Sequence, residues 1–144
     1  MEEEEMLRRE AEGYLDLAET YFESFKTLKR ANMYRVAVDV GYNAVELCIK
    51  ALILLRAGEI PRMHGGIVKK FGEIYMKSGE IPSEIGRKLH LSFESRNKAS
   101  SHARITVEDA DDVENLIKFL ISFLEREIRR AKACSRELRE QKSV

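Results

Sequence analysis

A dense run of hydrogen-bond donors in the second half of the chain contains an arginine and a histidine that could act together on a phosphate. The run RNKASSHAR occupies residues 96–104. The guanidinium of Arg96 offers a planar fork of donors, and Lys98 and Arg104 add two more cations. His102 is the side chain of this run that titrates near neutral pH, so it could accept or donate a proton. The run therefore suits phosphate binding with proton transfer beside it.

Arg96 stands where the helical pattern predicts an apolar side chain. Ile85, Leu89 and Phe93 step by four along one helix face, and Arg96 is the next residue on that face. Two interpretations fit this position. Either the helix leaves the core there and the arginine extends to water, or the arginine belongs to a binding site.

Arg96 and His102 can meet only if the helix ends between them. Six residues of unbroken helix would turn the two side chains roughly 240° apart. Ser100 and Ser101 favour an ending, because serine side chains compete for the hydrogen bonds of the helix backbone. We therefore expect a frayed helix end and a loop over residues 97–105.

The periodicity of the chain predicts five helices and no strands to position these residues. A composition with 35% charged and 44% hydrophobic residues, and with only 2 prolines, is typical of amphipathic helices. The first three expected helices run from about Glu3 to Lys29, from after Asn32 to Ala57, where Gly58 ends the helix, and from Ile67 to Lys77. The fourth begins near Pro82, and the fifth begins at a capping box formed by Thr106 and Asp109. Short connections favour antiparallel neighbours, so the expected fold is all-α, a four-to-five-helix up-and-down bundle.

The segment 34–55 is apolar apart from one narrow polar stripe. The residues of this stripe follow one another at intervals of three or four, as on one face of a helix. They are Arg35, Asp39, Asn43, Glu46 and Lys50. These groups exclude a membrane-spanning helix and predict the central, most buried helix of the bundle. The stripe either lines a cleft beside Arg96 or meets solvent or a second copy of the chain, and the sequence leaves both open.

The length of 144 residues suits one domain. We expect this domain to span residues 1–132 and to be followed by a frayed polar tail over residues 133–144.

Basic and acidic side chains number 25 each, so no global positive field attracts a polyanion, and nucleic-acid binding must be local. Two distant cysteines and a start of four glutamates exclude a disulfide framework and a secretory signal. We therefore expect a cytoplasmic protein.

The three histidines predict no metal site. His64, His90 and His102 are dispersed along the chain, and no carboxylate accompanies them at ligand spacing, so neither a metal nor another cofactor is expected. His64 lies between Pro61 and a glycine pair and is interpreted as a loop or helix-capping residue outside the site. His90 is interpreted as a surface residue.

The sequence RNKASSH resembles the motif of the HEPN family. That motif is an arginine, usually followed by a polar residue, and then a histidine after four to six intervening residues. Here five residues intervene, near the end of the fourth of five expected helices. The stretch NAVELCIKALILLRAGEIPRMHGGI, residues 43–67, resembles the second helix and following loop of HEPN proteins. The resemblance extends over residues 35–128.

The resemblance implies a helical bundle that forms a homodimer, with two motifs facing one cleft, and a metal-independent endoribonuclease activity. His102 would then act as general base or acid at a ribose 2′-hydroxyl, and Arg96 would neutralise charge on the phosphate. Asn97 would orient this pair, while Lys98 and Arg104 would hold neighbouring phosphates. RNA or a nucleotide is the expected ligand.

Asn43 and Glu46 complete the candidate site as substrate-binding residues of the second helix. Toxin-like family members often have a tyrosine two residues after the histidine, which a partner nucleotidyltransferase modifies. This chain has Arg104 there, which puts that control in doubt. Two alternatives to a toxin-like ribonuclease stay open: a non-catalytic module that binds nucleotide or substrate for a minimal nucleotidyltransferase, and a helical dimer in which Arg96 and His102 only stabilise a corner.

Overall fold

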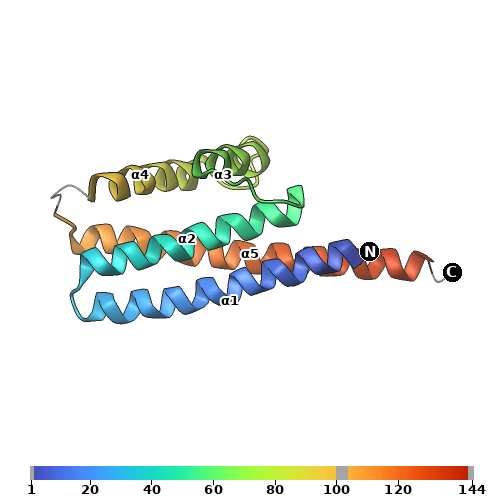
Figure 1. Ribbon diagram of the computed structural model, residues 1–144, viewed down its shortest axis with the longest axis horizontal. Coiled ribbons are helices and arrows are strands. Elements are labelled where there is room, and N and C mark those ends of the chain that lie inside the picture. Colours follow the sequence, from blue (N-terminus) through green and yellow to red (C-terminus); the bar gives the residue numbers. More distant parts are fainter. Residues whose placement is uncertain (1, 100–103, 143–144) are drawn as a thin grey trace.

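The computed structural model describes residues 2–99 and 104–142, and describes residues 93–99 by their backbone alone. Its elements are α1 (Glu2–Arg30), α2 (Tyr34–Ala57), α3 (His64–Phe71), the π-helical η1 (Gly72–Met76), α4 (Ser83–Ala99) and α5 (Val107–Lys142). No strand occurs in the described residues, and the helices run up and down along one axis (Figure 1). The expected all-α bundle is confirmed.

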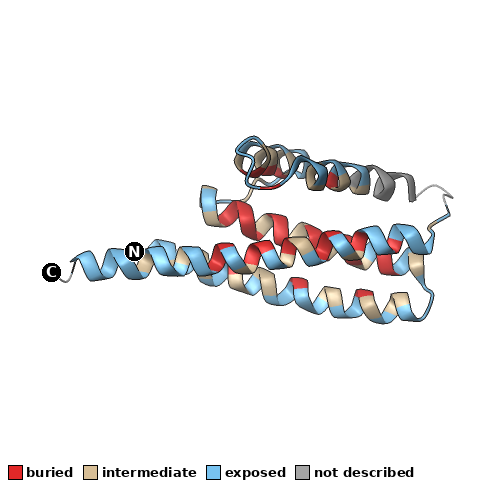
Figure 2. Cartoon of the chain, turned by 180° about the vertical axis from the view of Figure 1, so that it is seen from behind, coloured by how far each residue is buried: buried red, intermediate tan, exposed pale blue. Residues whose placement is uncertain are grey.

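Helices α1, α2 and α5 form a three-helix trunk with α2 at its centre (Figure 1). Figure 2 shows the buried residues concentrated where these helices face one another. Helix α2 contributes the largest buried set, as predicted, while α1 contributes Ala11, Ala18 and Phe25 at intervals of seven residues. Leu17 lies one position off this stripe and is 46% exposed. In the described part of the chain, no helix has an apolar stretch long enough to cross a membrane.

Helices α3 and α4 form a second layer over α2 and α5 (Figure 1). The third helix begins at His64, three residues before the expected start, and its second half is the π-helical η1. In that wider turn the buried Tyr75 hydroxyl donates to the Leu52 backbone carbonyl at 2.6 Å. The Tyr75 ring meets Phe123 of α5 edge-on, with 5.7 Å between ring centroids. These contacts anchor the second layer to both α2 and α5.

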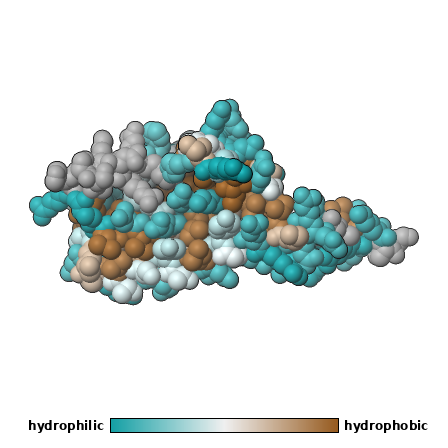
Figure 3. Space-filling view, in the orientation of Figure 1, coloured by the Kyte–Doolittle hydropathy of each residue, from teal (hydrophilic) through white to brown (hydrophobic). Residues whose placement is uncertain are grey.

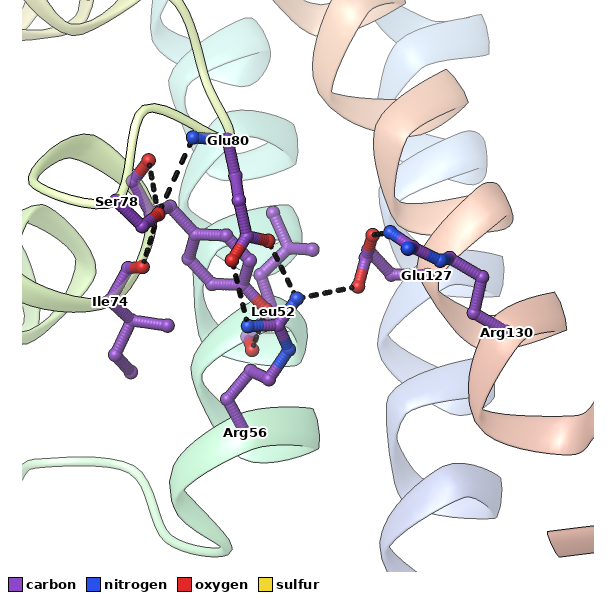
Figure 4. A network of polar contacts seen from close by, with 8 residues as sticks. Leu52, Arg56, Ile74, Ser78, Glu80, Glu127 and Arg130 are labelled. Carbon is purple, nitrogen blue, oxygen red and sulfur yellow. Dashed lines mark hydrogen bonds and ion pairs between the residues drawn. The ribbon is translucent and has the colours of Figure 1, made fainter. Parts of the chain in front are cut away.

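A network of charged side chains also joins the second layer to the trunk (Figure 4). Arg56 of α2 donates to the two carboxylate oxygens of Glu80 at 3.1 and 2.6 Å. The same guanidinium donates to Glu127 of α5 at 3.1 Å and lies over the Tyr75 ring at 5.2 Å. Arg130 donates to the other oxygen of Glu127 at 3.2 Å. Because Glu80 precedes α4, the network fixes the start of α4 against α2 and α5.

The predicted capping box opens α5. The Thr106 backbone N–H donates to the Asp109 carboxylate at 2.8 Å, and the Asp109 N–H donates to the Thr106 hydroxyl at 3.3 Å. The helix then continues to Lys142, so residues 133–142 are helical where we expected a frayed tail. An ion pair of 3.1 Å between Arg139 and Glu5 ties these last turns to the first turns of α1. The domain boundary at residue 132 stays a prediction.

Candidate functional site

The predicted motif falls at one end of the bundle. Helix α4 finishes at the end where α2 and α5 both begin, and Figures 1 and 2 show this from opposite sides. Arg96, Asn97 and Lys98 stand in the last turn of α4, and their side chains lie outside the described residues. His102 also lies outside the described residues. The backbone thus places the arginine end of the motif, and the meeting of Arg96 with His102 stays a prediction.

Ala99 and Arg104 are the described residues on either side of the motif's histidine. Helix α4 is described through Ala99, so residues 97–99 are helical where we expected fraying. Arg104 is exposed and non-helical, and it lies two residues before the Thr106 capping box. Ala99 and Arg104 both lie at this end of the bundle, and residues 100–103 lie outside the described residues.

The polar stripe of α2 meets the second layer at Glu46. One carboxylate oxygen of Glu46 lies 3.6 Å from Nδ1 of His64, the first residue of α3, and 3.8 Å from Nζ of Lys50. The Glu46 side chain is 22% exposed. At this point the stripe contacts another element of the same chain, and the interpretation that it lines a cleft beside Arg96 stays a prediction.

Asn43 lies one helical turn before Glu46 on the same face of α2. It is therefore nearer to the end of the bundle where α4 finishes. Its side chain is half-buried, and its amide donates to the backbone carbonyl of Asp39 at 3.4 Å. Asn43 and Glu46 thus share the stripe, but the described contact of Asn43 is within its own helix.

His64, which the sequence predicts to be a loop or helix-capping residue outside the candidate site, is the first residue of α3. The structure places its imidazole beside Glu46, and the side chain is 53% exposed. The sequence signal was local, because Pro61 before it and two glycines after it indicate only that a loop ends and a helix begins. Nothing in the sequence indicated which residue of α2 it would face across the intervening loop.

The acidic run at the start of α5 is largely engaged by neighbouring groups. Lys29 of α1 lies 2.5 Å from Asp111 and 3.4 Å from Glu114, while Asp109 belongs to the capping box. The hydrogen bond to Asp111 raises the pKa of Lys29 above its ordinary value. These contacts reduce the negative charge that the run would otherwise present beside the motif.

Among the residues that the structure describes, no group of three or more histidine, cysteine, aspartate or glutamate side chains is arranged to hold a metal ion. His64 and Glu46 form a pair, and Lys50, which lies 3.8 Å from the same Glu46 oxygen, is a cation and therefore not a metal ligand at neutral pH. His90, interpreted as a surface residue, is exposed on α4.

The fold and the α2–α3 contact define an all-helical domain with a polar stripe beneath its second layer. The family model for the HEPN domain matches residues 11–132 of the chain. The match covers most of the chain and all five helices in whole or in part. The chain therefore belongs to the HEPN family, as its sequence motifs predicted.

Two curated relatives come from the archaeon Methanocaldococcus jannaschii. The protein named "Putative toxin MJ0605" is 31% identical over 108 residues, which cover 74% of this chain and 80% of the relative. "Putative toxin MJ0142" is 29% identical over 102 residues, which cover 70% of this chain and 68% of the relative. The chain thus spans more than two thirds of each of these relatives.

Proposed function

We propose that this protein is a homodimeric, metal-independent endoribonuclease in which Arg96 and His102 act on one phosphate. The observation that carries this proposal is the position of the motif. It begins in the last turn of α4, at the end of the bundle toward which the polar stripe of α2 runs. The names of the two relatives support a toxin-like role. We expect the protein to act on RNA in the cytoplasm.

The proposed reaction is an intramolecular transfer at phosphorus. His102 removes the proton of a ribose 2′-hydroxyl as that oxygen attacks the adjacent phosphate. A bond forms between phosphorus and the 2′ oxygen, and the bond from phosphorus to the 5′ oxygen breaks. Arg96 stabilises the charge that gathers on the non-bridging oxygens. The leaving 5′ oxygen takes up a proton, so the products are a 2′,3′-cyclic phosphate and a 5′-hydroxyl.

Asn97, Lys98, Arg104, Asn43 and Glu46 are proposed to bind and orient the RNA around this phosphate. Arg104 is exposed directly after the motif, where it can meet a neighbouring phosphate. Asn43 and Glu46 lie on the stripe of α2, where they can meet polar groups of a ribose or base. Each of these residues is expected to affect RNA affinity more than the rate of the chemical step.

Exposed apolar side chains near the motif support the proposed homodimer. Met33 and Val36 at the start of α2 are 49% and 46% exposed, and Val107 at the start of α5 is 45% exposed. Figure 3 shows apolar surface over α1 and α2 toward this end of the bundle. A second copy that covered these side chains would bring the two motifs to one interface.

The proposal is tested by incubating the purified protein with single-stranded and structured RNA in a chelating buffer. We expect cleavage by the wild type, products with a 2′,3′-cyclic phosphate, and a loss of activity in His102→Ala of about a hundred-fold or more. The matched control is His90→Ala, which removes an exposed histidine of α4 and should leave the rate unchanged. Cleavage that persists in His102→Ala would overturn the proposal. RNA or nucleotide binding that requires Arg96 without any cleavage would instead indicate a binding partner of a minimal nucleotidyltransferase.

A further inference from the structure

Helices α1 and α5 continue side by side beyond the end of α2 (Figures 1 and 2). Helix α2 stops at Ala57, while an ion pair of 3.1 Å between Arg139 and Glu5 joins the extensions of the other two trunk helices. A cavity of about 270 Å³ lies where α2 ends, and residues of all three trunk helices line it. This cavity is at the opposite end of the bundle from the arginine–histidine motif.

The wall of the cavity is mainly apolar. Leu7 of α1, Leu55 of α2 and Leu138 of α5 contribute to it, and Leu138 is 43% exposed. A ligand that removes such surface from water gains free energy. At roughly 30 Å³ per non-hydrogen atom, the volume of one water molecule in the liquid, the cavity holds about nine such atoms. It therefore suits a small ligand with an apolar body.

Arg8 of α1 adds a largely buried guanidinium to the wall. Its side chain is 14% exposed, and its Nε atom is buried without a hydrogen-bond partner among the described residues. Its ion pairs with Glu5 and Glu12 span 3.7 and 3.9 Å, which is longer than a hydrogen bond. Glu5 instead accepts hydrogen bonds from Arg9 at 3.2 Å and from Arg139 at 3.1 Å.

The guanidinium of Arg8 favours an anionic group on the ligand. A buried N–H that lacks a hydrogen bond is costly, and a carboxylate is the acceptor that matches a guanidinium best. Glu4 also lines the cavity, but it is exposed, so water and salt screen its repulsion of an anion. The cavity thus combines an apolar wall with one cation that can receive a carboxylate.

We propose that this cavity binds a small carboxylate with an unbranched apolar chain of about six to eight carbons. The carboxylate accepts hydrogen bonds from Arg8, and the chain lies against the three leucines of the wall. Because the ligand contacts α1, α2 and α5 together, it stabilises the folded protein. The site shares no residue with the candidate ribonuclease site, so its test is independent of that function.

Cys134 lies in the wall of the cavity and reports on its occupancy. The full-length protein is treated with iodoacetamide in increasing hexanoate, and mass spectrometry of the Cys134 peptide gives the labelling rate. We expect a Kd of ~1 mM or below, so about 10 mM hexanoate should slow the labelling about ten-fold. Hexan-1-ol, which has the same chain without the charge, should need a concentration about ten-fold higher for the same effect.

Two variants separate the roles of charge and apolar surface. Arg8→Met removes the guanidinium and should weaken hexanoate binding about ten-fold or more, with little change for hexan-1-ol. Leu138→Gln should weaken both ligands about five-fold. Arg9→Met is the matched control, since the Arg9 side chain is 73% exposed and lies outside the lining, and it should bind as wild type. Labelling of the buried Cys48 identifies any variant that unfolds.

Three outcomes would overturn the proposal. The first is a Cys134 labelling rate that about 10 mM hexanoate leaves unchanged in the wild type. The second is equal protection by hexanoate and hexan-1-ol, because Arg8 then contributes nothing to binding. The third is a dimer in analytical ultracentrifugation that Leu138→Gln dissociates, because a second copy of the chain then fills the cavity.

Discussion

Arg56 of α2 lies 3.1 Å from the carboxylate of Glu127 on α5, a glutamate that is only 5% exposed. The same guanidinium holds Glu80 in the connection before α4, so one arginine links the trunk to the second layer. This hydrogen bonding to Glu80 is the main reason that the pKa of Arg56 is raised and that of Glu80 is lowered. The position of α4 over α2, on which the candidate site depends, therefore rests partly on Arg56.

Replacing Arg56 by alanine should destabilise the protein and loosen the second layer. In this variant Glu127 stays buried and loses Arg56, while its ion pair with Arg130 remains. A buried carboxylate that loses one of its cationic partners destabilises the folded state. We expect a loss of ~2 kcal/mol, below the cost for a fully buried pair because the Arg56 side chain is 37% exposed. Urea denaturation measures this loss, and Arg62→Ala in the exposed loop is the control. Equal stability of the two variants would show that the network contributes nothing.

Gly41 should not tolerate a methyl group. A Cβ at this position would lie 2.6 Å from Cγ1 of Val113 and 3.0 Å from the Phe25 ring, where α2 crosses α5 and α1. Since valine has one preferred rotamer in a helix, it cannot easily move aside. We expect Gly41→Ala to cost about 1–3 kcal/mol of unfolding free energy. Gly13→Ala is the matched control in α1, where an added Cβ meets nothing within 4 Å and should stabilise the helix by ~0.5–1 kcal/mol.

Stability should depend on pH through Glu19. Glu19 is exposed on α1, but a partial loss of hydration raises the pKa of its carboxyl, and the nearby carboxylate of Glu125 raises it further. The folded state therefore favours the protonated form, so this group contributes stability at low pH that is lost as the pH rises through its raised pKa. Glu19→Gln should raise Tm by about 1–2 °C at pH 7, with the gain vanishing below pH ~4. A gain that is the same at both pH values, or equal in the exposed Glu10→Gln control, would contradict this account.

The two cysteines should differ sharply in reactivity. Cys48 is fully buried in α2, and burial raises the pKa of its thiol to about 12. Cys134 is exposed on α5. Because the thiolate is the reactive form, iodoacetamide at pH 8 should label Cys134 and spare Cys48 until the protein unfolds. Mass spectrometry of the peptides reads this out, and labelling of native Cys134→Ser would show that the trunk opens.

Much of the fold could be predicted because local signals and tertiary packing agree. Gly58 ends α2 with a positive φ of 79°, and the Thr106–Asp109 box opens α5 as its spacing predicted. The π-helical η1 could not be predicted, because it depends on Tyr75 reaching Leu52 and Phe123, residues far away in the sequence. The helical end of α5 was missed for a similar reason, since its polar composition does not indicate the contact between Arg139 and Glu5.

The candidate site was predictable only in part. The donors of residues 96–104 stand out in the sequence because they interrupt an apolar face, and the periodicity of α2 indicated that Glu46 lies on a polar stripe. The pairing of His64 with Glu46 depends on how the loop between α2 and α3 folds back. Loop conformation of this kind is set by tertiary contacts, so a local interpretation of the proline and glycines around His64 could not find it.

The measurement that tests the central claim most directly is a double-mutant cycle on single-turnover RNA cleavage with Arg96→Ala, His102→Ala and the double variant. Residues that act as a unit on one phosphate give non-additive losses. We predict that each single variant loses about a hundred-fold or more in rate, and that the double variant is no slower than the slower single variant. Full activity of either single variant, or losses that multiply in the double variant, would contradict the account.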